Sequence, residues 1–343
     1  MALNWNWKFI SSGCPLKANG KVPTSAWSAT DFGRVAVCAG GESAEREISL
    51  RSGAAVAEAL QGAGIDVQLV DLDKQFFEQA VAGEFDRVFI AIHGRGGEDG
   101  ALQGFLDLIG LPYTGSRAAA SVLGMDKQLT KLQWQAAGLP TPAWRMVASL
   151  TELAEAAEAI GLPVMVKPVG EGSSIGMSLV EQEQQFEAAW IAANATEQPV
   201  MVERYVVGNE YTAAMVLDQR LPLVRITTPR KFYDYEAKYV SDETGYHCPA
   251  GLDPAAEEQL TDLAAQAFTA IGGCGWGRVD LLVDESGAAW LIEVNTVPGL
   301  TDHSLVPMAA RVHGWDFEVL ALAILSSSMT ECAASVAVGV AHG

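Results

Sequence analysis

Two apolar runs near the end of the chain constrain its fold more than any other stretch of the sequence. They span residues 277–283 and 288–295, and they flank the polar turn 284–287. Each run has the length and the aliphatic composition of a strand. A four-residue turn between them predicts an antiparallel hairpin in which Val283 pairs with Ala288. A sheet built around this hairpin is the first element of the fold that the sequence predicts.

Four polar side chains interrupt these strands, and the predicted register places them on one face. Leu291 falls opposite Asp280 and Glu293 opposite Arg278, and alternate residues of a strand point the same way. The residues on this face are Arg278, Asp280, Glu293 and Asn295. Carboxylates among apolar residues are costly to bury unless charge compensates them, and a divalent metal carrying nucleotide phosphates would do so. A hydrated polar face is the alternative. We favour the metal site because the acids lie within the strands rather than at the turn.

The charge of the chain limits its partners. The 343 residues carry a formal net charge of −20, and 49% of them are hydrophobic. A long contact with nucleic acid or with an anionic membrane needs a basic face, so we expect neither partner. A chain of this length is expected to bury a large core and to divide into two or three domains.

Cysteine usage and the two chain ends predict the compartment. The five cysteines are scattered and include no C-x-x-C pair, which favours reduced thiols over a disulfide framework or structural zinc. They are Cys14, Cys38, Cys248, Cys274 and Cys332. The start of the chain has no apolar core of signal-peptide length, and the apolar tail 332–340 is too short to cross a bilayer. We therefore expect a cytoplasmic protein without a membrane segment.

Turn and helix signals divide the chain into parts. Strand-like and helix-like segments alternate from residue 34 onward, which predicts a parallel α/β layer. A Pro-rich connection at residues 138–142 cannot continue a helix, and an α+β pattern follows it. The polar stretch 229–250 is long for a connection, so we expect it to be functional. The expected parts are a disordered extension 1–32, an N-terminal domain 33–125, a central domain 126–220, a C-terminal domain 221–330 with the loop 229–250, and a tail 331–343.

A glycine-rich loop after an apolar strand is a candidate phosphate site. Lys167 ends the strand, and residues 170–176 supply glycines and small hydroxyls whose backbone N–H groups can converge on phosphate oxygens. The loop is not a Walker A sequence, and a plain glycine-rich hairpin explains it equally well. Residues 172–176 also fit G-x-S-x-G, which would make Ser174 the nucleophile of a serine hydrolase. The predicted strand after the loop argues against that alternative, because a nucleophile elbow leads into a helix.

Further polar residues lie where strands end. His93 follows a buried strand, and Glu45 follows the first strand in the corresponding place. Ligands of open α/β sheets bind at these carboxyl ends, although a histidine or a carboxylate can also lie there without a function. Glu203 ends one strand and Glu210 begins the next, so either could meet the sugar or the amine of a nucleotide, or could be a surface acid.

The long polar loop also carries a cluster of aromatic residues. Residues 232–239 contain Phe232, Lys238 and several tyrosines, the last of which is Tyr239. The pattern around them gives no packing reason for such a cluster. A lid that closes over a site is therefore our hypothesis for this segment.

Taken together, four motifs closely resemble those of the D-alanine–D-alanine ligase family. They are HGRGGEDG at 93–100, KP at 167–168 with EGSS at 171–174, YDYEAKY at 233–239, and RVD at 278–280 with EVNT at 293–296. The resemblance runs in order from about residue 34 to residue 325. It implies the ATP-grasp fold, with α/β and α+β layers and an N-terminal parallel α/β domain. It also implies an enzyme that joins two D-alanines with ATP for peptidoglycan synthesis.

The resemblance implies a nucleotide site between the central and C-terminal domains. Its residues would be Lys127 and Lys167 on the phosphates, Glu203 and Glu210 on the adenosine, and Asp280, Glu293 and Asn295 on two Mg²⁺ or Mn²⁺ ions. The first D-alanine carboxylate would take the γ-phosphoryl group, and the second D-alanine amine would attack the acyl phosphate. Such chemistry needs positioning and charge neutralisation, which metals and lysines supply.

The resemblance also implies a site for the two D-alanines and a homodimer. Glu45 and His93 would bind the first D-alanine, and Ser304 and Leu305 would bind the carboxylate of the second. Arg278 and the Gly299 N–H would bind the oxyanion, and Lys238 would bind the phosphoryl group. Glu45, Ser173 and Tyr239 would form the hydrogen-bonded group that closes the lid. A closed lid would keep water away from the acyl phosphate.

The chain departs from the family pattern at a few positions. Glu42 and Val297 stand where Thr or Ser, and Ser or Met, are expected, and Arg204 replaces a usual lysine. None of these changes removes a catalytic group. The alternatives within the fold are another carboxylate–amine ligase and a D-alanine–D-lactate ligase. A non-catalytic nucleotide-binding regulator would be expected to lose metal ligands, and all three are present.

Overall fold

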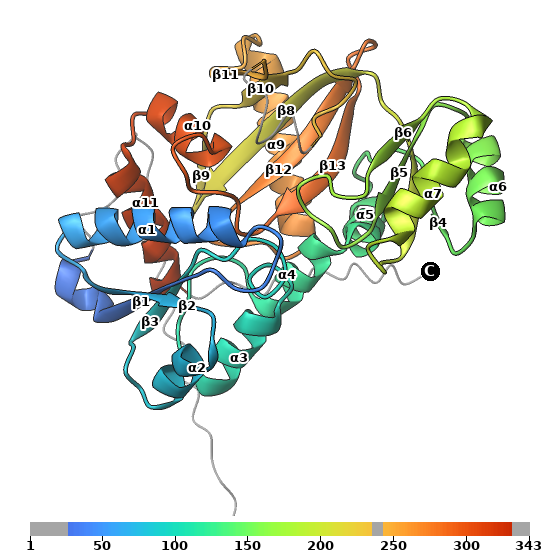
Figure 1. Ribbon diagram of the computed structural model, residues 1–343. Coiled ribbons are helices and arrows are strands. Elements are labelled where there is room, and N and C mark those ends of the chain that lie inside the picture. The colour runs from blue at the N-terminus through green and yellow to red at the C-terminus, as the bar shows by residue number, and fades with distance from the viewer. Residues whose placement is uncertain (1–26, 235–242, 331–343) are drawn as a thin grey trace, which may run out of the picture.

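The computed structural model describes residues 27–234 and 243–330. Its N-terminal part is a parallel sheet in the strand order β2-β1-β3, with helices packed on it (Figure 1). The elements are β1 (Arg34–Ala39), α1 (Arg46–Gly62), β2 (Asp66–Asp71), α2 (Lys74–Val81), β3 (Arg87–Ile90), α3 (Ala101–Ile109) and α4 (Ala118–Met125). β1 and β3 are almost entirely buried, as parallel strands covered on both faces are. The predicted parallel α/β layer is confirmed.

The last residues of the expected N-terminal extension are ordered. Ala29–Phe32 form the 3-10 helix η1, and the side chain of Phe32 is buried in the core. Arg87 fixes this segment, because its Nε donates to the Phe32 carbonyl at 2.6 Å and its guanidinium lies 5.7 Å from the centroid of the ring. The remainder of the expected extension, residues 1–26, and the expected tail 331–343 lie outside the described residues.

A four-stranded antiparallel sheet in the order β4-β7-β5-β6 forms the central part. Its elements are α5 (Lys127–Ala136), β4 (Trp144–Val147), α6 (Leu150–Ile160), β5 (Val164–Pro168), β6 (Ser178–Val180), η2 (Glu183–Gln185), α7 (Phe186–Asn194) and β7 (Val200–Arg204). α6 and α7 pack against the sheet around Leu153 and Val166 (Figure 1). α6 begins after the N-cap Ser149, whose Oγ accepts from the Glu152 N–H at 3.2 Å, while the Glu152 carboxylate accepts from the Ala148 N–H, one residue before the cap.

A six-stranded antiparallel sheet forms the C-terminal part, in the order β11-β10-β8-β12-β13, with β9 paired to β8. Its strands and helices are β8 (Gly208–Val216), β9 (Gln219–Arg220), β10 (Val224–Thr227), β11 (Gly245–His247), α9 (Pro254–Ala270), β12 (Trp276–Asp284), β13 (Ala289–Asn295), α10 (Leu305–His313), α11 (Phe317–Ser326) and η3 (Ser327–Met329). β11 lies within the stretch 229–250 that we expected to be a loop. β8 precedes residue 220 but belongs to this sheet. The division between the central and C-terminal domains at residue 220 stays a prediction.

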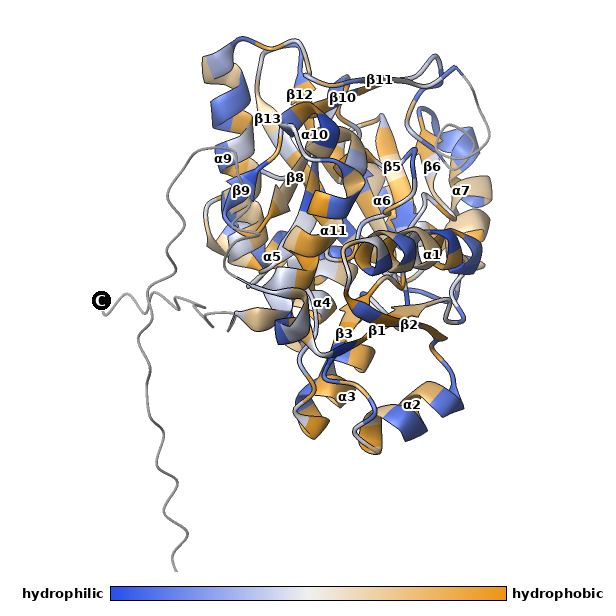
Figure 2. Ribbon diagram, turned by 90° about the vertical axis from the view of Figure 1, so that its left-hand side faces the viewer, coloured by the Kyte–Doolittle hydropathy of each residue, from blue (hydrophilic) through white to orange (hydrophobic). Residues whose placement is uncertain are grey.

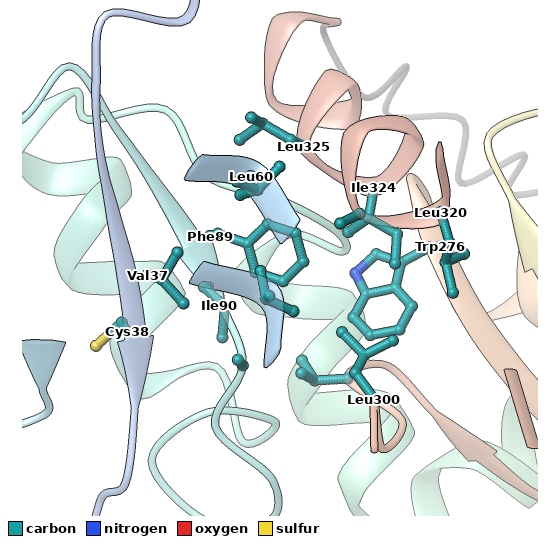
Figure 3. Close-up of a cluster of buried hydrophobic side chains, with 14 of the residues drawn as sticks. Val37, Cys38, Leu60, Phe89, Ile90, Trp276, Leu300, Leu320, Ile324 and Leu325 are labelled. Carbon is teal, nitrogen blue, oxygen red and sulfur yellow. The ribbon is translucent and has the colours of Figure 1, made fainter. Parts of the chain in front are cut away.

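One hydrophobic core joins the N-terminal sheet to the C-terminal part. Trp276 of β12 and Leu300 belong to the same buried cluster as Phe89 and Ile90 of the N-terminal sheet, together with Ile324 of α11 (Figure 3). Burial of a large aromatic side chain removes much apolar surface from water, so it contributes strongly to this contact. The loop that follows β13 is therefore fixed against the N-terminal sheet.

The hairpin of β12 and β13 forms, but the predicted register is wrong. Asp280 pairs with Glu293, whereas Leu281 pairs with Leu291, so a β-bulge adds Ile292 to β13 between these two pairs. The expected pairings of Val283 with Ala288 and of Asp280 with Leu291 do not occur, because Val283 pairs with Ala289 and Asp280 with Glu293. The expected pairing of Glu293 with an arginine does not occur either, because Glu293 lies opposite Asp280.

The bulge has a physical reason. Leu291 and Val294 are both buried in the core beneath the sheet. They are three residues apart, and a regular strand would point them to opposite faces. The extra residue reverses the alternation, so Leu291 reaches the core while Ile292 and Glu293 both line a cavity. The polar residues of the hairpin share one face, as predicted.

Three of the five cysteines lie among the described residues. Cys38 and Cys248 are free thiols, whereas Cys274 is disulfide-bonded, which corrects the expectation of reduced thiols for that residue. Cys14 and Cys332 lie outside the described residues. Within the described ranges, no helix is both long and apolar enough to cross a membrane.

Candidate active site

Two cavities meet at Glu293 of β13. The first has a volume of about 290 Å³, and its walls include Lys167 of the four-stranded sheet and Asp280 of the six-stranded sheet. The second has a volume of about 490 Å³, and its walls include Glu45 at the start of α1 and Ser304 before α10. Glu293 lines both cavities. Ligands held in the two cavities would therefore meet at this carboxylate.

The polar face of the hairpin is a cluster of hydrogen bonds around Asp280. Arg278 donates from Nε to Oδ1 at 2.8 Å and from Nη2 to Oδ2 at 2.7 Å. Asn295, which pairs with Arg278 across the hairpin, donates from Nδ2 to Oδ2 at 3.2 Å, and the Thr212 hydroxyl donates to Oδ1 at 2.5 Å. Charge-assisted, bidentate bonds of this kind offset much of the cost of removing both charges from water. Asp280 is thus the counterion of Arg278.

The donor set of this face fits a hard divalent cation. Asp280, Glu293 and Asn295 offer carboxylate and amide oxygens, which Mg²⁺ and Mn²⁺ prefer. The described residues contain no group of three His, Cys, Asp or Glu side chains placed to hold a metal, so the set depends on the amide oxygen of Asn295. Asp280 accepts four hydrogen bonds. A cation on Asp280 would therefore share the carboxylate with these donors or replace one of them.

Lys127 lines the first cavity beside Glu293. Its Nζ is 3.5 Å from Glu293 Oε2 and donates to the carbonyl of Glu171 at 2.7 Å. Lys127 is the first residue of α5, and Asp126 caps this helix by accepting from the Leu129 N–H at 2.9 Å. The cap therefore fixes the turn that carries an ammonium group to the point where phosphate charge would lie.

Glu203 is held between two lysines at the wall of the first cavity. Lys167 Nζ donates to Oε1 at 3.0 Å, and Lys131 Nζ lies 2.6 Å from Oε2. Burial pushes the pKa of Glu203 upward, but the charges of Lys131 and Lys167 outweigh burial and leave the pKa below its usual value. Glu203, Lys167 and Glu210 all line this cavity, whereas Lys131 lies behind it.

The glycine-rich loop 170–176 approaches the meeting point of the two cavities. Ser173 Oγ donates to Glu45 Oε1 at 2.5 Å, which ties the loop to the start of α1. Gly94 and Gly172 make room for this carboxylate, since a Cβ would lie 2.9 Å from Glu45 Oε2 at Gly94 and 3.1 Å at Gly172. Ser173 has a φ of 50°, in the left-handed region that costs a non-glycine residue free energy. The loop is therefore held in this conformation by its contacts.

The geometry around Ser174 excludes the serine hydrolase alternative. The loop joins the antiparallel strands β5 and β6, whereas a nucleophile elbow leads from a strand into a helix. The Ser174 hydroxyl donates to the carbonyl of Tyr233 at 3.1 Å, so its proton is directed to a carbonyl oxygen rather than to a base.

His93 fixes the loop that follows β13. Its Nδ1 lies 2.8 Å from the Val297 carbonyl, and its Nε2 lies 2.9 Å from Ser52 Oγ. Burial lowers the pKa of His93, so the ring is neutral at pH 7. Because a carbonyl only accepts, Nδ1 carries the proton and Nε2 accepts from Ser52, which itself accepts from the Leu300 N–H. Both ring nitrogens are therefore engaged within the protein.

Glu98 holds the same loop from the other side. Its carboxylate accepts from the Val297 N–H at 2.9 Å and from the Gly94 N–H at 2.8 Å. Burial, reinforced by the charge of Glu45, raises the pKa of Glu98 to about 7. Together with His93, Glu98 thus engages both backbone polar groups of Val297.

Gly299 and Ser304 lie side by side in the second cavity. The Ser304 hydroxyl accepts from the Thr301 N–H at 2.9 Å, and a Cβ at Gly299 would lie 2.8 Å from Ser304 Oγ. Leu305 is the first residue of α10 and lines the same cavity. The N-terminus of α10 carries backbone N–H groups that favour an anion, so a carboxylate fits this end of the cavity.

Three predicted residues remain, and the structure describes one of them, Arg204. Arg204 lines the first cavity, and its guanidinium lies 4.3 Å from the centroid of a Trp290 ring. Lys238 and Tyr239 lie outside the described residues. Flanking that segment, Tyr233 and Tyr246 have their hydroxyls 2.9 Å apart at the wall of the second cavity.

Sequence reasoning missed the residues that act behind the cavities. Lys131 lies one helical turn after Lys127, and a lysine on the buried side of a helix was the signal available. Ser52, Thr141 and Thr212 are hydroxyls on buried or half-buried faces, and their partners are distant in sequence. No local pattern could have assigned those partners.

Comparisons with known proteins identify the family. A sequence model of the D-ala D-ala ligase C-terminus matches residues 133–326, and one of the D-ala D-ala ligase N-terminus matches residues 75–116. The D-alanine–D-alanine ligase of Pseudomonas putida is 52% identical over 298 residues, which cover 87% of this chain and 94% of the relative. The D-alanine–D-alanine ligase of Methylococcus capsulatus is 53% identical over 300 residues, which cover 88% and 97%.

Solved structures agree with the sequence relatives. The D-alanyl-alanine synthetase A of Vibrio cholerae superposes with a TM-score of 0.77 at 26% identity and covers 87% of this chain and 98% of its own. The Bacillus anthracis D-alanine–D-alanine ligase complexed with ATP gives 0.75 at 26% identity, covering 86% and 97%. The chain therefore belongs to the D-alanine–D-alanine ligase family and has the ATP-grasp fold of that family.

Proposed function

We propose that this enzyme joins two D-alanines to D-alanyl-D-alanine with conversion of ATP to ADP and phosphate, and that it does so at Glu293. The observation that carries the proposal is that Glu293 lines both cavities. A nucleotide in the first cavity and D-alanine in the second would bring a phosphoryl donor and a carboxylate to one point. The dipeptide serves peptidoglycan precursor synthesis, which is the known role of the family.

In this proposal the first cavity holds ATP. Lys127 and Lys167 bind phosphate oxygens as point charges, while Glu203 and Glu210 bind the adenosine. Ile292 lines this cavity directly beside Glu293, which suits an apolar contact with the base. Asp280, Glu293 and Asn295 would hold two Mg²⁺ or Mn²⁺ ions, which when bound neutralise phosphate charge.

The second cavity holds the two D-alanines. Glu45, whose carboxylate Ser173 orients, binds the ammonium group of the first D-alanine. The carboxylate oxygen of this D-alanine attacks the γ-phosphorus and ADP leaves, which gives D-alanyl phosphate. The amine of the second D-alanine, after loss of a proton, attacks the acyl carbon, and phosphate leaves. Ser304 and the start of α10, at Leu305, bind the carboxylate of the second D-alanine.

Charge that develops on the acyl oxygen is stabilised by fixed groups. Arg278 and the Gly299 N–H are positioned before the reaction, the former by Asp280 and the latter by the loop that His93 holds. His93 thus contributes to the first D-alanine site through this loop. Lys238 on the phosphoryl group and Tyr239 with Ser173 and Glu45 would close the lid.

We also propose that the enzyme is a cytoplasmic homodimer. An apolar patch formed by Phe77 and Val81 of α2 and Phe105 and Leu108 of α3 supports an interface, since the Phe77 and Phe105 rings are in contact at 4.9 Å. Val81 is 66% and Leu108 is 84% exposed. Figure 2 places α2 and α3 together at one end of the molecule, with hydrophobic turns on both. Exposed apolar patches of this kind mark interaction sites.

Phosphate release from ATP tests the proposed function. The assay compares D-alanine with L-alanine, with D-lactate plus D-alanine, and with no substrate, and mass spectrometry identifies the product. We expect release only when D-alanine is present, with D-alanyl-D-alanine as the product. A product that contains D-lactate in preference to a second D-alanine would overturn the proposed second substrate. Equal release without D-alanine would overturn the ligase reaction itself.

A further inference from the structure

A fully buried lysine lies behind the first cavity. The side chain of Lys131 is 0% exposed, and its Nζ lies 2.6 Å from Glu203 Oε2 and 2.6 Å from Thr141 Oγ1. Lysine is rarely buried without a partner, because removing an ammonium group from water is costly. Lys131 does not line the cavity, so binding phosphate directly does not explain it.

The contacts of Lys131 continue into the C-terminal sheet. Thr141 Oγ1 donates to the Leu291 carbonyl at 3.0 Å, and the Leu291 N–H donates to the Pro140 carbonyl at 2.9 Å. Both backbone polar groups of Leu291 are therefore held by the segment that enters the central sheet. Leu291 directly precedes the bulge that turns Ile292 and Glu293 into the cavity. The position of the bulge thus depends on Thr141.

The contacts that Lys131 makes with Glu203 affect the charge of the wall of the first cavity. Lys131 and Lys167 share the single carboxylate of Glu203, so the three groups keep a net positive charge. Burial lowers the pKa of Lys131 to about 8, which leaves it a cation at neutral pH. Without Lys131, the charge of Lys167 would be matched by Glu203 and would attract phosphate less strongly.

We propose that Lys131 is a positioning residue for nucleotide recognition: it orients Glu203 toward the base and, through Thr141, fixes the bulge that presents Ile292. This inference rests on the proposed placement of ATP in the first cavity. A carboxylate accepts from the exocyclic amine of adenine, whereas guanine has an acceptor oxygen at the corresponding position. A Glu203 carboxylate held in one orientation therefore favours ATP over GTP. A Glu203 carboxylate that is free to reorient should show a weaker preference for ATP.

The test compares Lys131→Met, which removes the charge with little change in length, with Thr141→Val, which removes one hydroxyl. Lys74→Met is the matched control, because Lys74 is an exposed lysine of α2 that forms an ion pair with Glu78 of the same helix. For Lys131→Met we expect the KM for ATP to rise on the order of tenfold, which reduces the apparent affinity to about one tenth, with kcat changed by less than about twofold. The preference for ATP over GTP should fall by a similar factor. Thr141→Val should move both quantities in the same direction, and Lys74→Met neither.

A double variant separates positioning from a merely structural role. In a Glu203→Gln background, Lys131→Met should raise the KM for ATP by less than about twofold, because the residue through which it acts is already changed. Wild-type KM for ATP and wild-type ATP to GTP preference in a folded Lys131→Met variant would overturn the inference. If that variant does not fold, wild-type values for Thr141→Val would overturn it instead. Calorimetric binding of ATP and GTP gives the same comparison without dipeptide formation, so failure of the proposed function remains distinguishable.

Discussion

Asp280 and Glu293 lie on one face of the hairpin but differ in what their removal leaves behind. Asp280→Ala leaves Arg278 without its bidentate partner in a site where both side chains are mostly buried, so we expect a loss of about 3 kcal/mol in the free energy of unfolding. Glu293→Ala removes a carboxylate 3.5 Å from Lys127, but Lys127 keeps its hydrogen bond to the Glu171 carbonyl, so we expect a smaller loss of about 1.5 kcal/mol. Both variants should lose ligase activity.

Thermal unfolding and turnover at saturating Mg²⁺ check this prediction together. The expected result is a much lower melting temperature for Asp280→Ala than for Glu293→Ala, with dipeptide synthesis at least about a hundredfold slower in both. Near-normal turnover of Glu293→Ala would mean that the substrates bound in the two cavities do not react at this carboxylate. Equal melting temperatures would mean that Arg278 finds another counterion.

The raised pKa of Glu98 makes the free energy of unfolding depend on pH. Burial and the charge of Glu45 raise its pKa from 4.5 to about 7, so the folded protein holds this proton more tightly than the unfolded chain does. The stability that the protonated form contributes is fully present below pH 4.5 and is lost as the pH rises through about 7. The loss amounts to at most about 3 kcal/mol.

Glu98→Gln isolates this contribution, because glutamine does not titrate. Urea unfolding of both proteins at pH 5 and at pH 8 should show that the wild type loses stability relative to the variant between the two pH values. The variant also places an amide where an N–H of Gly94 or Val297 points, which lowers its stability by the same amount at each pH. Parallel pH profiles for the two proteins would contradict the raised pKa.

At the scale of elements, the N-cap of α5 controls the turn that carries Lys127. Asp126 accepts from the Leu129 N–H, and replacing such a cap by alanine costs about 1 kcal/mol. We expect Asp126→Ala to lower the melting temperature and to raise the KM for ATP, because the first turn of α5 frays. Asp126→Asn keeps a capping side chain and should stay close to wild type. A KM for ATP that rises equally in both variants would assign the effect to the charge of Asp126 rather than to the cap.

Elements with a strong local signal could be predicted from the sequence. The parallel N-terminal layer and the hairpin both follow from periodicity and turn residues. The bulge at Ile292 could not be predicted, because Leu291 and Ile292 are both apolar and either could face the core. Packing against the cluster under the sheet decides between them.

The same limit applied to the residues behind the site. Glu203 could be placed at the end of a strand, but its position between Lys131 and Lys167 brings together side chains of β7, α5 and β5. His93 could be placed at a strand end, but its bond with Val297 joins residues more than two hundred positions apart. Contacts of this kind are products of the whole fold, so local pattern cannot assign them.

At the scale of the whole molecule, β13 is held at both ends by other parts of the protein. Thr141 and Pro140 engage Leu291 before the bulge, and Glu98 and His93 engage Val297 just beyond the strand. One strand therefore carries groups that face the first cavity and groups that face the second, and its position depends on the N-terminal and central parts together. This arrangement suits a reaction that needs two sites in fixed register.

The apolar patch on α2 and α3 tests the proposed assembly. Val81→Glu and Leu108→Glu each place a charge in a surface that a partner copy would have to desolvate, so we expect the dimer to dissociate. Ile191→Glu is the matched control, because Ile191 of α7 is an apolar residue of similar exposure on the central part. Sedimentation equilibrium at micromolar concentration should give a dimer for the wild type and for Ile191→Glu, and a monomer for the two patch variants. A monomeric wild type, or dissociation by Ile191→Glu alone, would move the interface away from this patch.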